Sequence, residues 1–135
     1  MGLQYEQARR ALDAALQKAT DIASPSSVAI VDQGRELVAF ARQDGALLAS
    51  TEISQGKAYT SLSMRMATKD IGPLTQPGQP LFGLEHTQSR PLVSFAGGRP
   101  LEVGGEVVGA VGVAGGTVDQ DDEIAAAAAA ALASA

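Results

Sequence analysis

Residues Leu92–Gly116, LVSFAGGRPLEVGGEVVGAVGVAGG, decide the fold of this chain. Apolar residues alternate through the stretch, and glycine pairs interrupt the alternation twice before a further pair ends it. Alternation broken by glycine is typical of antiparallel strands joined by hairpins, because glycine readily adopts the positive φ of tight turns. We therefore predict three consecutive strands, Leu92–Phe95, Arg99–Val103 and Glu106–Ala114, at the centre of an antiparallel sheet.

The last of these strands is apolar at nearly every position, which predicts burial on both faces. Gly109 and Gly112 lie within it and indicate close approach by a helix or by another chain. Pro100, near the start of the preceding strand, suits an end or edge position. After the final glycine pair we predict a helix over Thr117–Ala133, in which Thr117 and Gln120 have the spacing of a capping box.

The upstream part of the chain is predicted to supply two helices and one hairpin. A helix is expected over Gln4–Ala23, where apolar residues recur every three or four positions. Strands Ser27–Asp32 and Glu36–Arg42 flank a Gln-Gly turn. A second helix, Ser50–Thr68, is expected to begin with Ser50 as its cap. The following stretch, Ile71–Arg90, is rich in proline and glycine, so we expect an irregular loop, and a loop of this length is often functional.

These elements follow the order α-β-β-α-loop-β-β-β-α. Five strands joined mostly by hairpins predict a five-stranded antiparallel sheet, and the helices are too few to alternate with strands as in a doubly wound fold. We therefore predict a two-layer α+β fold. The sequence shows no internal repeat and no linker, so we expect residues 1–135 to form a single domain.

Composition excludes several classes of function. The net charge is -5 and aromatic residues make up 4% of the 135 residues, so a nucleic-acid partner is not expected. The absence of cysteine removes disulfides and thiolate metal sites. No apolar run reaches the length of a membrane span, and charged residues stand where a signal sequence would be apolar. We expect a cytoplasmic protein without a membrane partner.

Two groups of residues are candidates for chemistry. His86 and Phe82 lie in the long loop, and His86, the only histidine, can act as an axial haem ligand or as a general base. The plainer interpretation is a solvated surface histidine. Arg42, Asp44 and Lys57 can converge on an anion or a propionate, with the alternative that Asp44 belongs to a salt-bridged turn.

The glycine pair before the last helix resembles a phosphate cradle, but the acidic residues that follow would repel phosphate. The cluster Asp119–Glu123 is better explained as a charge cap at a helix start, with a divalent cation site as the weaker alternative. One histidine among many serines does not indicate a catalytic triad. No catalytic residue is assigned.

Several segments, in order, resemble the GlcG/HbpS-like family, which also includes the C-terminal domain of PduO-type cobalamin adenosyltransferases. The matching segments are Ser27–Asp32 with Gly34, Arg42-x-Asp44-Gly45-Ala46, Lys57-Ala58, Phe95-x-Gly97-Gly98-x-Pro100-Leu101, and Val108–Gly116 followed by Asp119-Gln120-Asp121. The resemblance implies a profilin-like α+β domain with a five-stranded sheet, assembly into homo-oligomers, and haem as a ligand of several members. Family members use a histidine near the N-terminus for haem, whereas this chain has no histidine before His86.

The leading hypothesis is a small-ligand-binding homo-oligomer that binds haem or a related tetrapyrrole, with Arg42, Asp44, Lys57, Phe82 and His86 as ligand-binding residues. The alternative is an enzyme acting on a small organic acid or carbonyl compound. In that case Arg42 or Lys57 holds a carboxylate, and His86 or Asp44 moves a proton, between the loop and the end of the sheet. A structural or assembly partner is the remaining alternative, and it predicts no pocket beside the loop.

Overall fold

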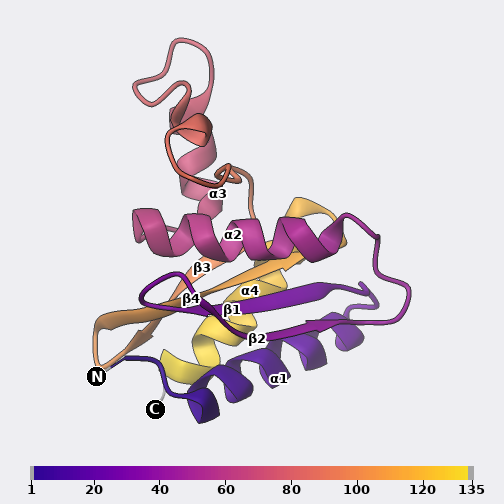
Figure 1. Cartoon of the computed structure of the whole chain (residues 1–135). Coiled ribbons are helices and arrows are strands. Elements are labelled where there is room, and N and C mark those ends of the chain that lie inside the picture. Colours follow the sequence, from indigo (N-terminus) through magenta and orange to yellow (C-terminus); the bar gives the residue numbers. More distant parts are fainter. Residues whose placement is uncertain (1, 134–135) are drawn as a thin grey trace.

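A computed structural model describes residues 2–133 of the chain (Figure 1). Four strands form one antiparallel sheet in the order β2-β1-β4-β3. The helices and strands are α1 (Tyr5–Asp21), β1 (Ser27–Asp32), β2 (Leu37–Arg42), α2 (Ser50–Met64), α3 (Thr68–Ile71), β3 (Gly98–Val103), β4 (Glu106–Ala114) and α4 (Val118–Ala133). None of the helices described is both long and apolar enough to cross a bilayer.

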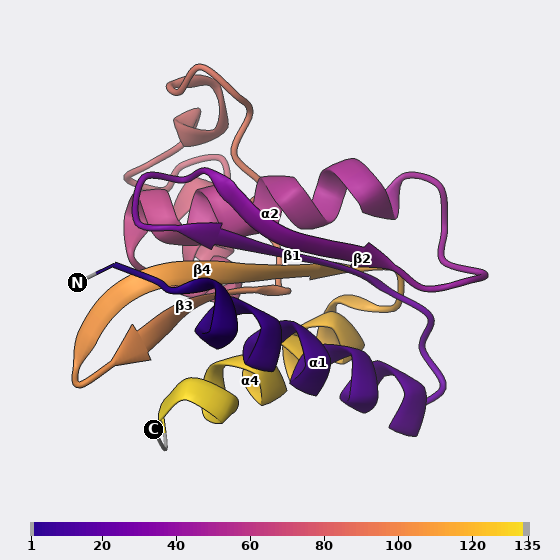
Figure 2. The same ribbon diagram turned by 60° about the horizontal axis from the view of Figure 1, so that its bottom comes forward.

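Helices cover both faces of the sheet, so the fold has three layers and the prediction of two was wrong (Figures 1 and 2). On one face α1 and α4 pack together through small residues, and Ala8, Ala11 and Ala15 meet the sheet in one fully buried cluster. On the other face α2 packs through Ala58 and Leu62. The second layer of helix is needed because β1 and β4 are apolar on both sides.

The central position of β4 confirms the prediction for Glu106–Ala114. A Cβ added at Gly112 would lie 2.5 Å from the backbone nitrogen of Ala58, so its absence lets α2 approach the strand. At Gly109 the close neighbour is instead the carbonyl oxygen of Val31 in β1. As Pro100 indicated, β3 is an edge strand.

The predicted strand Leu92–Phe95 is not a strand, and the sheet therefore has four strands and not five. The segment has no regular secondary structure and lies against α2, where the amide of Val93 donates to Oγ1 of Thr60 (2.8 Å). Pairing with β4 begins only at Gly98. Alternation predicts an extended backbone; it does not tell whether that backbone pairs with a strand or packs on a helix.

Two boundaries in the middle of the chain also differ from expectation. The second helix ends at Met64 and is followed by the short α3, so the single helix Ser50–Thr68 was wrong. Ser50 lies inside the first turn of α2, and its hydroxyl bonds that of Ser27 (2.7 Å) in place of capping the helix. The long loop contains two short 3-10 turns, η1 (Gly72–Thr75) and η2 (Leu84–His86), and it extends beyond α2 (Figure 1).

Candidate functional site

Helix α2 has one face on the sheet and one on the loop. Ser54 and Ala58 approach Gly112 of β4. Gly56 and Thr60, about half a helical turn away, meet Val93 of the loop segment. The loop therefore builds a surface on the side of α2 that the sheet does not use (Figures 1 and 2).

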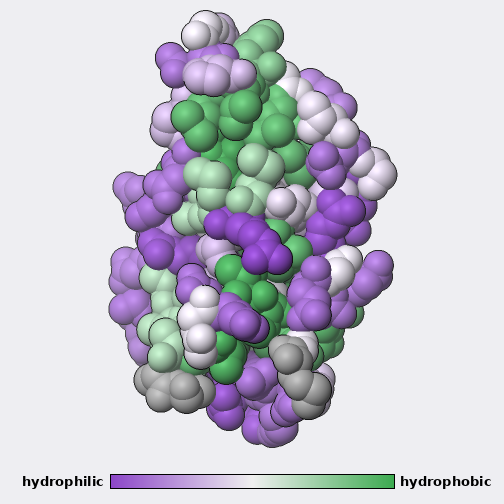
Figure 3. Space-filling view, turned by 90° about the vertical axis from the view of Figure 1, so that its left-hand side faces the viewer, coloured by the Kyte–Doolittle hydropathy of each residue, from purple (hydrophilic) through white to green (hydrophobic). Residues whose placement is uncertain are grey.

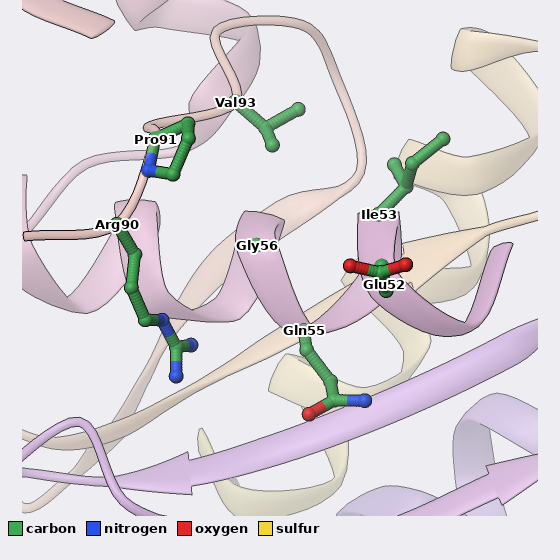
Figure 4. A pocket seen from close by; sticks show the side chains of 7 residues that line it. All are labelled: Glu52, Ile53, Gln55, Gly56, Arg90, Pro91 and Val93. Atoms are coloured by element: carbon green, nitrogen blue, oxygen red, sulfur yellow. The ribbon is translucent and has the colours of Figure 1, made fainter. Parts of the chain in front are cut away.

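A groove of about 440 Å³ runs between α2 and the end of the loop (Figure 4). The helix contributes one wall and residues 90–93 contribute the other. The seven lining residues are Glu52, Ile53, Gln55, Gly56, Arg90, Pro91 and Val93. Figure 4 shows the side chains of Arg90 and Gln55 extending toward the same side, whereas Ile53 extends the opposite way and Val93 points sideways from the loop, above the helix. The groove thus has a polar side and an apolar side.

Gly56 permits this arrangement of helix and loop. A Cβ at this position would lie 2.8 Å from Cγ2 of Val93, closer than side chains tolerate. Glycine inside a helix is less favourable than alanine by about 1 kcal/mol, so the contact with Val93 offsets an intrinsic penalty. Close packing against the loop therefore explains this glycine.

Tyr59 holds the arginine of the groove. Its ring is buried, with 4% of the residue exposed, and the guanidinium carbon of Arg90 lies 4.4 Å from the ring centroid. Arg35 also lies over the ring, at 4.6 Å. Cations over an aromatic face are attracted by its quadrupole. The Arg90 side chain is therefore positioned before any ligand arrives.

Lys57 lies under this surface in a buried ion pair with Asp121 of α4. Only 1% of the lysine is exposed, and its Nζ lies 3.0 Å from Oδ2 of Asp121 and donates to the carbonyl oxygen of Val113 (2.8 Å). The amide of Gly116 donates to the other carboxylate oxygen (3.0 Å). Burial lowers the pKa of Lys57 and raises that of Asp121, while the charge of each partner opposes the shift of the other. The pair fastens α2 to the start of α4.

The acidic start of α4 is used for ion pairs. Asp122 pairs with Arg99 at 2.8 Å and with Lys69 at 3.4 Å. The predicted capping box is confirmed, because the amides of Thr117 and Gln120 each donate to the side chain of the other. Within residues 2–133 no three His, Cys, Asp or Glu side chains are grouped to hold a metal ion.

The structure does not bring the five predicted site residues together. Arg42 and Asp44 are exposed at the end of β2 on the sheet side of α2, whereas Phe82 and His86 are exposed in the loop on its other side (Figure 1). Lys57 is enclosed between them with Asp121. The arrangement supposed for an enzyme between the loop and the sheet end is therefore absent from the described structure.

Sequence reasoning missed the residues that line the groove. The available signals were a glycine inside a predicted helix and the pair Arg90-Pro91 at the end of a long loop. It also missed that Asp121 is the partner of Lys57. The hypothesis of a purely structural partner predicted no pocket beside the loop, and the groove contradicts it.

Comparison with known proteins decides the family. A family model described as "Haem degrading protein HbpS-like" matches residues 3–130. This chain belongs to the HbpS-like family. A relative, the 15.0 kDa protein of the dhaT-dhaS intergenic region of Citrobacter freundii, is 41% identical over 114 residues, which are 84% of this chain and 80% of that protein. Protein GlcG of Escherichia coli is 36% identical over 87 residues, 64% of this chain and 62% of GlcG.

The corrinoid adenosyltransferase PduO of Salmonella typhimurium is 37% identical over 133 residues, 98% of this chain but only 39% of PduO. Two solved structures share the fold at 35% identity. Klebsiella pneumoniae ORFY has a TM-score of 0.92, with 96% of this chain and 90% of ORFY covered. The PduOC:Heme complex has a TM-score of 0.91, with 97% and 95% covered. The predicted resemblance to the GlcG/HbpS-like family and to PduO is confirmed.

Proposed function

We propose that this HbpS-like chain binds haem or a related tetrapyrrole in the groove between α2 and residues 90–93. The observation that carries the proposal is the pairing of an apolar side with an arginine that is already held in place. A volume of about 440 Å³ lies within the range of small-molecule sites. A relative of closely similar fold was solved as a heme complex, which supports haem as the ligand class.

The groove suits the periphery of a tetrapyrrole. Ile53, Pro91 and Val93 offer apolar contact to a flat ring system, and Arg90 offers a forked donor for a propionate carboxylate. None of the seven lining residues is a histidine, cysteine, methionine or tyrosine, the side chains that usually hold haem iron. An iron ligand must therefore come from beside the groove.

His86 is the residue we propose for that role. It follows Glu85, whose carbonyl oxygen accepts from the amide of Leu92 (3.1 Å) and whose carboxylate accepts from the hydroxyl of Ser94 (2.8 Å). These bonds tie the turn that carries His86 to both sides of Val93 in the groove wall. Bound haem would supply a redox-active iron, and the protein would supply the ring contacts, the propionate anchor and the imidazole.

We also propose that the binding form is a homo-oligomer. Hydrophobic side chains gather on the upper part of the face in Figure 3, which the loop of residues 72–90 occupies, and Phe82 in that loop is 67% exposed. An exposed apolar cluster of this kind is typical of an interaction surface.

Hemin titration tests the proposal. We expect a saturable shift of the Soret band with the native chain, a different band position with His86→Ala, and binding weakened by about tenfold with Arg90→Gln, because a charge-assisted contact is lost. Arg42→Gln is the matched control, since Arg42 is an exposed arginine away from the groove. Native mass spectrometry of the same samples reports copy number and retained tetrapyrrole. An unchanged Soret band at micromolar native protein would exclude the proposal.

A further inference from the structure

A second cavity of about 420 Å³ lies between the β1–β2 turn and the C-terminal end of α2. Its polar lining comes from three parts of the chain: Gln33 and Arg35 from the turn, Ser63 and Arg65 from the end of α2, and Gln88 from the loop. We call this cavity the arginine cleft. It shares no lining residue with the groove, and Arg35 of the cleft and Arg90 of the groove both lie over the ring of Tyr59.

The arginine cleft is positively charged in a chain whose net charge is -5. Within residues 2–133 neither Arg35 nor Arg65 forms an ion pair with a carboxylate. The protein partners of Arg35 are neutral, since its Nη1 donates to Oγ of Ser63 (3.1 Å) and Oε1 of Gln88 (3.1 Å). Neither guanidinium is thus held by a described carboxylate at salt-bridge distance.

The backbone at both arginines is unusual. Arg35 has φ 67 and Arg65 has φ 53, and Ala23 is the only other non-glycine residue in the described chain with a positive φ. A turn or a helix C-terminus in this conformation is most easily made by glycine, and a residue with a side chain is less favourable there. Two arginines held in the left-handed region at one cleft indicate that their side chains serve a purpose beyond the turn and the cap.

Arg35 is also preorganised for a ligand. The stack on Tyr59 and the two bonds through Nη1 fix the plane of the guanidinium. Its Nε and Nη2 groups have no acceptor among the described residues, and they form one edge of the planar fork. That edge matches the two oxygens of a carboxylate or phosphate.

We propose that the arginine cleft binds the oxyanion group of a small molecule, a carboxylate or a phosphate, with Arg35 as the forked donor and Arg65 as the second positive charge. Gln33 and Gln88 also line the cleft, and their amides can meet the rest of such a molecule. This site does not depend on tetrapyrrole binding in the groove, and haem-free protein is sufficient to test it.

The test is an NMR titration of ¹⁵N-labelled, haem-free protein with malonate and, separately, with inorganic phosphate at constant ionic strength. We expect saturable shifts of the Arg35 side-chain signal and of the amides of Gly34 and Ser63. The two probes report which oxyanion is preferred, and saturable binding of either one supports the site. Arg65→Gln should raise the dissociation constant at least about tenfold, because one charged donor is lost.

Arg35→Gln should weaken binding by at least as much, and Arg42→Gln, an exposed arginine outside the cleft, should leave the dissociation constant unchanged. Arg65→Gln keeps the test decisive if Arg35→Gln does not fold, since Arg65 is exposed and makes no ion pair in the described chain. Shifts that do not saturate, or that Arg42→Gln reduces as much as Arg65→Gln does, would overturn the proposal. Hemin binding plays no part in these outcomes, so they are independent of the groove.

Discussion

Replacing Lys57 by methionine tests whether the buried ion pair determines the stability of this fold. The substitution keeps most of the unbranched side chain and removes the ammonium that donates to both Asp121 and the carbonyl oxygen of Val113. Asp121 would then remain as a buried carboxylate with one described donor, the amide of Gly116. An isolated buried charge is strongly unfavourable because its hydration is not replaced.

The expected loss is about 3–5 kcal/mol in the free energy of unfolding, the range for breaking one partner out of a buried pair. For a chain of 135 residues this corresponds to a fall in Tm of roughly 10–18 °C. Asp121→Leu should be similarly destabilising, since it leaves the buried ammonium of Lys57 without its carboxylate partner. The double variant should lose much less than the sum, because no buried charge is left in it.

Urea and thermal denaturation of the three variants supply the measurement, with Lys18→Met as the control. Lys18 pairs with Glu123 at 3.1 Å on the surface, where 37% of the lysine side chain is exposed, so its loss should cost less than about 1 kcal/mol. The reasoning fails if Lys57→Met is no more destabilising than Lys18→Met, or if the two single effects at the buried pair simply add.

The pH dependence of Lys57→Met provides a further check. Burial raises the pKa of Asp121, and the lysine opposes that shift in the native chain. Without the lysine the folded-state pKa lies further above the unfolded value, so the folded state binds a proton more readily. The loss of stability in Lys57→Met is therefore largest above the folded-state pKa of Asp121, and it should shrink as the pH falls through that pKa.

Two further predictions concern the sheet and the start of α4. Gly112→Ala should lower the free energy of unfolding by about 1–3 kcal/mol or more, because the new Cβ meets the backbone of α2. Gly34→Ala is the control: its new Cβ meets no backbone atom, so the free energy of unfolding should change by less than about 0.5 kcal/mol. Urea denaturation measures both. At Asp122, burial acts to raise the pKa, but the hydrogen bonds and charges of Arg99 and Lys69 together outweigh it, so the pKa lies below its usual value. Its stabilising effect is therefore present above the unfolded pKa and lost as the pH falls through the folded one. Asp122→Asn should flatten the stability profile below about pH 4 by up to about 1 kcal/mol, and an unaltered acid limb would contradict this.

Most of the fold was predictable because the central strand, β4, has a sequence pattern with one clear interpretation. A run of nine mostly apolar residues between glycine turns has few solutions other than a strand buried on both faces. A strand buried on both faces also requires helices on both faces of the sheet, and the prediction of two layers overlooked this requirement. Leu92–Phe95 was wrong because local alternation carries no information about the partner of an extended segment.

The site was less predictable because its parts come from distant segments whose contacts depend on α2. Small residues lie on every side of this helix, so the hydrophobic periodicity of its sequence did not indicate which face meets the sheet. Lys57 was predicted to meet a ligand, yet its partner stands 64 residues further along the chain. Nothing local to Arg35 or Arg65 indicates that a turn and a helix end share one cleft.

The two walls of the groove rest on different supports. Helix α2, which forms one wall, packs on the sheet through Ser54 and Ala58 and is joined to α4 by the ion pair of Lys57. This wall is therefore part of the packed core. The opposite wall belongs to a loop that touches the helix through a valine, a tyrosine stack and a few hydrogen bonds. Insertions or exchanges in that loop can therefore reshape the opening without loosening the sheet. Proteins built on this plan can diverge in what they hold while remaining superimposable in how they fold.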